Sequence, residues 1–367
     1  MHAAVNRPQA QLAVLIDVSL ILGAHHMRSC SIVRAPAPAK LAWMTTHNRR
    51  SLTAALGAGL GAGLALPGLV RAAPHPAQME PKGDQPIVAT VAPSNLKPGQ
   101  TIETSNDPFK RMTAPVLLNG RGPNFFVVDT GANQSVISSE VAAALGLPPG
   151  PIVDLHGVAG VERTPTVMVE RVQVGARVEK DVLMPVLPEA AIGAPGIIGI
   201  DRLRNQRVKL DFRLHHLTVA PSGYTDLPAF TSKVHARQVS GQLLIVDADL
   251  AGIPVSVFLD SGAERTIGNP ALQQLAVLRV QQGGFFDVPV ISVTGKTLRG
   301  QIALLPILRM GHVRLVDISV TFADLHVFQI WGLERPAMLL GMDALSTFDS
   351  VSLDFGRAEV WFELYPR

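Results

Sequence analysis

The residues of this sequence that could do chemistry are two aspartates in matching surroundings. Asp129 ends an apolar run of β-prone residues and is followed by threonine, glycine and alanine, whereas Asp260 is followed by serine, glycine and alanine. Two carboxyls held side by side cannot both ionise at low cost, so they hold one proton between them. Such a pair can offer a base and an acid to one water molecule. The two aspartates are therefore candidates for acid–base chemistry, provided that the fold brings them together.

Each aspartate must be positioned by a strand and a tight turn. The runs Phe125–Val128 and Val257–Leu259 are typical of buried strands. The glycine after each aspartate lets the chain turn back sharply, and the hydroxyl residue can bond to nearby main chain. A single Asp-Ser-Gly is also ordinary turn chemistry. Two copies with matching flanks indicate a repeated unit.

The flanks of the two stretches repeat as well. Downstream, Ser138 or Ser139 can cap a helix over Glu140–Leu145, and Asn269 can cap one that opens with Pro270. Each half then has a late apolar–glycine motif and closes on two strand-like runs. The late motifs are Gly196–Leu203 and Met338–Leu345, and the closing runs are Val208–Phe212 with Leu217–Val219, and Val351–Phe355 with Val360–Phe362. The pattern indicates internal duplication of a unit of about 110–130 residues, longer than a solenoid repeat.

These motifs resemble those of the retropepsin-like aspartic proteases, which carry an apolar run before Asp-Thr/Ser-Gly-Ala and a later Ile-Ile-Gly or Leu-Leu-Gly. The tandem arrangement resembles the pepsin-like plan, in which two lobes of one chain each contribute one aspartate. The resemblance covers roughly residues 108–365. It implies an all-β fold of two retropepsin-like or pepsin-like β-barrel lobes with short helices. A cleft would lie between the lobes, with both aspartate turns at its floor.

The resemblance also implies a role for each residue of the two turns. Asp129 and Asp260 would be the catalytic dyad of a peptide hydrolase, with a water molecule activated between them. The hydroxyl residues would brace the turns across the lobes, and the glycines would let main-chain amides approach the carboxylates. These supporting residues are Thr130, Gly131, Ser261 and Gly262. Two further acids, Asp201 and Asp343, follow the late motifs, and we interpret them as helix-start residues that fix each lobe.

A glycine-flanked apolar tip, Gly157-Val158-Ala159-Gly160, lies between strand-like runs of the first half. By resemblance this is the flap that closes over substrate, and an ordinary surface hairpin is the alternative. Pepsin flaps carry a tyrosine that this segment lacks, so it is more similar to a glycine-rich retropepsin flap. We expect His156 to be a solvated loop residue without a catalytic role. Ile291–Lys296 is a second candidate flap, and the sequence leaves open whether one flap or two work.

The composition bounds the partners of the protein. Residues 1–72 carry seven of the 32 lysines and arginines but one of the 29 acids, so the remainder has a net charge of −3. We therefore expect no nucleic-acid partner. The 11 histidines show no spacing that places ligands on one face, so we expect no metal and no cofactor. The expected partner is a peptide or protein substrate.

The N-terminal region has the features of an export signal. The pair Arg49–Arg50 precedes a mildly apolar stretch, 51–70, and small residues follow up to Ala73. This pattern resembles a twin-arginine-type signal and predicts a periplasmic or secreted protein, in contact with the membrane only through an uncleaved signal. A membrane anchor is the alternative. We expect translation to start at Met44, so the only cysteine, Cys30, precedes the protein and no disulfide is needed.

We therefore expect five parts in the chain. They are an N-terminal extension with the export signal (1–72), a flexible leader (73–107), a first lobe (108–220), a linker (221–232) and a second lobe (233–365). For the leader, a pro-segment that covers the cleft is the alternative.

Three functions fit this organisation. The first is an exported aspartic endopeptidase in which one chain forms the whole site. The second is a non-catalytic peptide-binding protein, which loss of an aspartate or its glycine would favour, although both halves keep these residues. The third is an enzyme that works as a dimer of duplicated chains. A linker of about a dozen residues favours pairing within one chain, because closing such a loop costs little, and we therefore expect a monomer.

Overall fold

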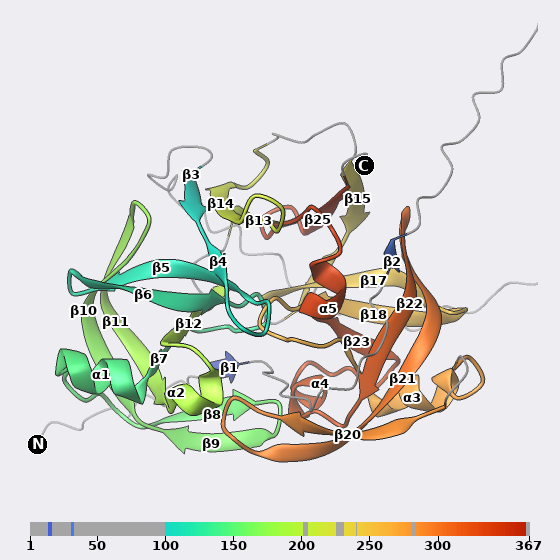
Figure 1. Cartoon of the computed structure of the whole chain (residues 1–367), viewed down its shortest axis with the longest axis horizontal. Helices are drawn as coiled ribbons and strands as arrows, with labels where there is room; N and C mark the ends of the chain where they lie inside the picture. Colours follow the sequence, from blue (N-terminus) through green and yellow to red (C-terminus); the bar gives the residue numbers. More distant parts are fainter. Residues whose placement is uncertain are drawn as a thin grey trace, which may run out of the picture. The chain divides into compact units, whose positions relative to one another are not determined.

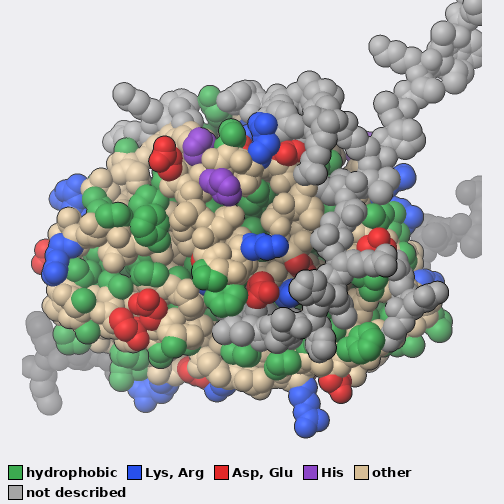
Figure 2. Space-filling view, viewed as in Figure 1, with side chains coloured by type: hydrophobic (Ala, Val, Ile, Leu, Met, Phe, Trp, Pro, Cys, Tyr) green, Lys and Arg blue, Asp and Glu red, His purple; other side chains and the backbone are tan. Residues whose placement is uncertain are grey.

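The computed structural model describes residues 14–16, 31–32, 100–200, 205–224, 231–239, 241–280 and 284–364. The expected export signal, most of the leader, Asp201 and residues 225–230 of the expected linker lie outside the described residues. Within the described ranges, no helix is long and apolar enough to cross a membrane. On the face shown in Figure 2, acidic and basic side chains are interspersed.

The first lobe is a closed barrel of six strands in the order β5-β6-β12-β7-β11-β10, because β10 also pairs with β5. Alternation of side chains across the strands sends one set of apolar residues into the barrel. A short strand, β4 (Ser105–Asn106), extends the sheet beyond β5. The barrel strands are β5 (Met112–Leu118), β6 (Arg121–Val128), β7 (Val136–Ser138), β10 (Thr166–Val174), β11 (Arg177–Leu187) and β12 (Gly196–Ile198).

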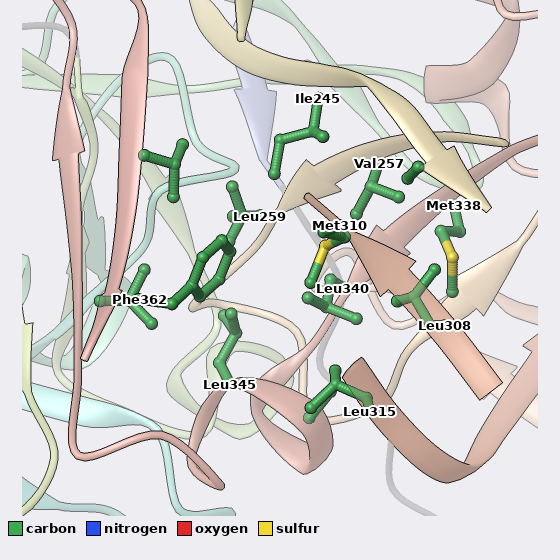
Figure 3. Packing of buried hydrophobic residues seen from close by; sticks show 14 of the residues in the cluster. Ile245, Val257, Leu259, Leu308, Met310, Leu315, Met338, Leu340, Leu345 and Phe362 are labelled. Atoms are coloured by element: carbon green, nitrogen blue, oxygen red, sulfur yellow. The ribbon is translucent and has the colours of Figure 1, made fainter. Parts of the chain in front are cut away.

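The second lobe repeats this barrel in the order β17-β18-β23-β19-β22-β21, with β21 pairing back to β17. Its core is apolar: Figure 3 shows Val257, Met310 and Leu340 packed in one cluster, all fully buried. The strands, with the flanking β16 and β20, are β16 (Arg237–Val239), β17 (Gln242–Leu250), β18 (Ile253–Leu259), β19 (Ile267–Gly268), β20 (Phe286–Ile291), β21 (Thr297–Met310), β22 (Val313–Phe322) and β23 (Ala337–Leu340).

A third sheet joins the two halves in the order β15-β25-β24-β13-β14-β3. The junction is the antiparallel pair β13–β24, in which Leu210 lies opposite Val351. The strands are β3 (Gln100–Glu103), β13 (Gln206–Asp211), β14 (His216–Pro221), β15 (Thr231–His235), β24 (Ser350–Asp354) and β25 (Glu359–Glu363). The closing strands predicted for each half are β13 and β14, and β24 and β25. All four lie in this one sheet.

Short helices follow the aspartate turns, as predicted. The Ser138 hydroxyl accepts from the Val141 amide at the start of α1 (Ser139–Leu145), which ends at Gly146 in the left-handed conformation with φ of 63°. Asn269 caps α3 (Pro270–Ala276) in the same way. The other helices of the described chain are α2 (Glu189–Ile192), α4 (His326–Ile330) and α5 (Met342–Leu345).

Two hairpins project from the barrels. In the first lobe, β8 (Val153–Gly157) pairs with β9 (Gly160–Thr164), and in the second lobe β20 pairs with β21. Two short N-terminal strands lie at sheet edges: β1 (Val14–Ile16) runs parallel to β8, and β2 (Ser31–Ile32) runs antiparallel to β22. Figure 1 shows these strands and the two barrels, which confirm the predicted all-β fold of two retropepsin-like lobes.

Candidate active site

The two aspartate turns occupy equivalent places in the two barrels. Asp129 follows β6, which runs parallel to β12, and Asp260 follows β18, which runs parallel to β23. Both aspartates are buried, with 2% and 1% of their surface exposed. Strand pairing on both sides of each turn therefore fixes the position of each carboxyl.

Within each turn the aspartate is held by main-chain amides. Oδ1 of Asp129 accepts hydrogen bonds from the amides of Gly131 (2.7 Å) and Ala132 (3.0 Å). Oδ1 of Asp260 accepts from the two corresponding amides of its own turn, at 2.9 and 3.1 Å. All four of these bonds end on Oδ1, and none of them involves Oδ2 of either carboxyl.

The two turns are bonded directly to each other. The Thr130 amide donates to Ser261 Oγ (3.0 Å), and the Ser261 amide donates to Thr130 Oγ1 (3.0 Å). Each hydroxyl then donates to a carbonyl of the opposite strand, Thr130 to Leu259 (2.9 Å) and Ser261 to Val128 (2.8 Å). All four bonds are buried, so a shift of one turn would break hydrogen bonds of the other.

Glycine is required where the first carboxyl meets the second turn. A Cβ added at Gly262 would overlap the carboxyl carbon and both carboxyl oxygens of Asp129. The Asp129 carboxyl therefore rests on the main chain beside Asp260, and the turns bring the two predicted acids together.

The electrostatics of the site favour retention of one proton. Burial, followed by the charge of Asp260, raises the pKa of Asp129 to about 8, against the opposing effect of the turn amides and of Arg111. This is the behaviour of two carboxyls that cannot both ionise at low cost. The pair therefore keeps a proton far above the usual range of an aspartate.

Two residues that the sequence analysis missed support the turns. Arg111 and Gln242 each stand 18 residues before the aspartate of their half. Arg111 is buried, forms an ion pair with Asp107 (2.7 Å) and donates to the Ile192 carbonyl (3.0 Å). Gln242 reaches across the lobes from β17 and donates to the Gly131 carbonyl at 3.0 Å. Their equal distance from the aspartates is the signal that could have identified them.

The cation of Arg111 acts beyond its own half. It lowers the pKa of Asp129, and it is among the groups that lower the pKa of Glu264, which burial raises. Gln242 also donates to Asn133 Oδ1 (2.8 Å) in the opposite lobe. Equivalent positions thus hold a charged group in one half and an amide in the other.

The late aspartate of the second lobe, Asp343, lies at the start of a helix and bonds to a neighbouring segment. Asp343 lies in the first turn of α5, where it accepts a hydrogen bond from Thr266 Oγ1 (2.7 Å). Burial raises its pKa to about 6. The Thr266 hydroxyl also accepts from the Gly341 amide (3.2 Å), so this pair ties the turn region to the late glycine.

The tips of the two hairpins contact opposite lobes. Val158, between Gly157 and Gly160 of the first lobe, is fully buried in an apolar cluster with Ala263 of the second aspartate turn. Val293 of the second hairpin, 1% exposed, belongs to a cluster with Ala132 of the first turn. The Lys296 ammonium forms an ion pair with the Glu162 carboxylate of β9 (2.8 Å).

One expectation about the first hairpin is wrong. His156 is not a solvated loop residue: it lies on β8, half-buried, with its ring stacked on that of His326. Strand β8 sends alternate side chains to opposite faces, and this face is covered by α4 of the second lobe. Across the described ranges, no group of three or more His, Cys, Asp or Glu side chains could hold a metal.

Two solved structures match the chain at low sequence identity. Conglutin gamma, a basic 7S globulin from lupine seeds, has 10% identity and a TM-score of 0.40, covering 73% of this chain and 96% of its own. A retropepsin-like aspartic protease from Rickettsia conorii has 14% identity and a TM-score of 0.25, covering 38% of this chain and 98% of its own. No curated protein matches the sequence.

Two family models match the chain in tandem. The model described as "gag-polyprotein putative aspartyl protease" matches residues 114–205, and the model described as "Aspartyl protease" matches residues 246–344. Each match contains one aspartate turn and most of one barrel. The chain therefore belongs to the retropepsin-like aspartic proteases, with two such domains in tandem.

Proposed function

We propose that the protein is an exported aspartic endopeptidase that hydrolyses peptide bonds with a water molecule held between Asp129 and Asp260. The observation that carries this proposal is the reciprocal bonding of Thr130 and Ser261, which sets the two carboxyls against each other in one chain. Two aspartyl protease domains supply the substrate class, a peptide or protein.

The roles of the two acids follow from the proton that they share. The raised pKa of Asp129 supports a reactive state in which the pair holds one proton, so that one carboxyl is protonated and the other is a carboxylate. The carboxylate takes a proton from the water as the water oxygen attacks the carbonyl carbon, and the protonated carboxyl gives its proton to the carbonyl oxygen. The carboxyl that took the water proton then gives it to the amide nitrogen as the C–N bond breaks and the amine leaves. A hydroxyl of the gem-diol gives its proton to the other carboxylate as the product acid forms, so the pair again holds one proton.

The two hairpins are proposed to cover the bound peptide. The support is that Val158 and Val293 lie in clusters that also contain the alanines of the aspartate turns. Both hairpins make such contacts, which favours two working flaps over one.

A non-catalytic peptide-binding protein is the competing proposal. Such a protein has no need for a pair of buried acids that share a proton. Burying them costs stability, and groups perturbed in this way cluster at functional sites. Digestion of a peptide library by the full chain at several pH values, with Asp129→Ala as control, tests the choice. Cleavage by the wild type alone supports the endopeptidase, whereas binding without cleavage supports the competing proposal.

Export remains a proposal based on Arg49–Arg50 and the small residues before Ala73. We propose a periplasmic or secreted monomer whose mature chain begins near Ala73. N-terminal sequencing of protein from a host with a twin-arginine pathway tests it. An intact Met44 start on a cytoplasmic product would contradict the proposal.

A further inference from the structure

Two histidines from opposite lobes stack on each other beside the first hairpin. His156 lies on β8, and His326 is the first residue of α4. Their ring centroids are 5.7 Å apart and the ring planes differ by 12°. His156 Nδ1 and His326 Nε2 are buried and have no hydrogen-bond partner. The stack therefore joins the hairpin to the second lobe, and each ring has one buried nitrogen without a hydrogen-bond partner.

The same helix holds the tip of the hairpin. The His326 amide donates a hydrogen bond to the Val158 carbonyl (2.7 Å). The Val158 side chain is fully buried in a cluster with Leu325, Phe328 and Trp331. The tip is thus docked by apolar burial, by one main-chain hydrogen bond and by the histidine stack.

We propose that the His156–His326 stack is an acid-sensitive catch, which holds the first hairpin on α4 while both rings are neutral and releases it when both are protonated. The proposal rests on the proposed function, since it concerns access of substrate to the dyad. Histidine is the side chain whose charge ordinarily changes between pH 5 and 8. Two imidazolium rings at 5.7 Å repel each other. Protonation would also bury two N–H donors without acceptors.

Among the described residues, no charged group is bonded to either ring. The charged groups on the elements around the stack are Asp154 on β8, Glu162 and Arg163 on β9, Lys296 in the turn before β21, and Asp324 before α4. Glu162 is paired with Lys296, and Asp154 lies opposite Arg163 in the β-ladder. Among the residues that the structure describes, no hydrogen bond or ion pair joins any of them to either ring. Strand β1 carries no titratable residue.

The catch would make access of substrate to the dyad depend on pH in a range where the protonation of the dyad does not change. The dyad keeps its shared proton through the acidic and neutral range, because the pKa of Asp129 is raised to about 8. Chemistry alone would therefore leave the site competent at neutral pH. A hairpin that opens only in acid would restrict turnover of large substrates to an acidic environment.

Hydrogen exchange tests the catch without relying on catalysis. The probe is exchange of the amides of residues 153–164 and of the His326 amide, in the full chain carrying Asp129→Asn, at pH 7.5 and 5.5 after correction for the intrinsic exchange rate. We expect protection to fall about tenfold at pH 5.5, the size of the repulsion at an effective dielectric constant between protein and water. His156→Phe and His326→Phe, which keep an aromatic ring but cannot protonate, should each show equal protection at both pH values.

The control is His235→Phe, an exposed position on β15 that should keep the tenfold change. Equal protection at both pH values in the Asp129→Asn parent would overturn the catch, and this comparison needs no histidine variant to fold. A tenfold change that persists in both phenylalanine variants would overturn it as well. Peptide cleavage by the wild type is measured separately, so failure of the proposed function and failure of the catch are distinguishable.

Discussion

At the scale of single residues, the raised pKa of Asp129 makes the stability of the fold depend on pH. Its pKa is raised from 3.8 to about 8 in the folded protein, so the folded state holds a proton that the unfolded state releases. The stabilisation from this proton is fully present below about pH 4 and is lost as pH rises toward 8. The buried, ionised carboxyl then weakens the fold.

Asp129→Asn should therefore gain stability over the wild type as pH rises. We expect similar melting temperatures at pH 4 and a melting temperature higher by a few degrees in the variant at pH 8.5, since the amide has no charge to desolvate. Thermal unfolding followed by circular dichroism measures the difference. Asp181→Asn, at an exposed site, is the control that should show no such trend. A constant difference across the pH range would mean that Asp129 does not hold a shared proton.

At the scale of elements, the two equivalent helix caps differ in the hydrogen bonds that they make beyond their helices. Ser138 and Asn269 stand at the same place after the two aspartate turns and cap α1 and α3. The Asn269 side chain has further bonds: it accepts from the Ala337 amide (3.1 Å) and donates to the carbonyls of Leu333 (2.9 Å) and Arg335 (2.7 Å). In the second lobe the cap also anchors the segment that leads into β23.

Asn269→Ala should therefore cost more than Ser138→Ala. We expect a loss of about 1 kcal/mol for the serine cap and about 2–4 kcal/mol for the asparagine, whose removal leaves the buried Ala337 amide and two partly buried carbonyls without their partners. Urea unfolding of both variants measures the two losses. Equal losses would show that the added Asn269 bonds contribute nothing.

At the scale of the whole molecule, the third sheet ties the lobes into one unit. Strand β13 from the first half pairs with β24 from the second, and the turns bond across the lobes through Thr130 and Ser261. One chain thus makes all the contacts that join the two aspartates. A dimer of duplicated chains is unnecessary for the site.

Specific activity should then be independent of enzyme concentration. We expect constant turnover per chain over a hundredfold dilution, with a monomer mass by light scattering. A dimeric enzyme would lose activity in proportion to its dissociation at low concentration. A fall in specific activity on dilution would support the dimer of duplicated chains.

The sequence predicted those parts of the molecule that repeat. The strand–aspartate–turn–helix pattern around Asp129 and Asp260 predicted the barrels and the helices α1 and α3, because periodicity, glycine and cap residues act locally. The hairpin at residues 153–164 followed from its glycine-flanked tip. The duplication distinguished these two aspartate turns from an ordinary Asp-Ser-Gly turn.

Long-range contacts without a local signature were missed. Gln242 bonds to Gly131, 111 residues earlier, and its one sequence signal is that it lies 18 residues before Asp260, as Arg111 lies 18 residues before Asp129. The stack of His156 on His326 joins two lobes through residues 170 apart in the sequence. Such contacts form only when the barrels pack, so local propensity does not reveal which residues will meet.

The central claim is that one chain supplies both carboxyls of one catalytic site. Its most direct test is hydrolysis of a quenched peptide by the wild type, Asp129→Asn, Asp260→Asn and the double variant, with circular dichroism to show that each is folded. We expect each single variant to lose about 10³-fold or more in turnover and the double variant to be scarcely worse, because groups that act as a unit are not additive. Near-wild-type turnover by folded Asp260→Asn would contradict the claim and leave the second lobe a structural role alone.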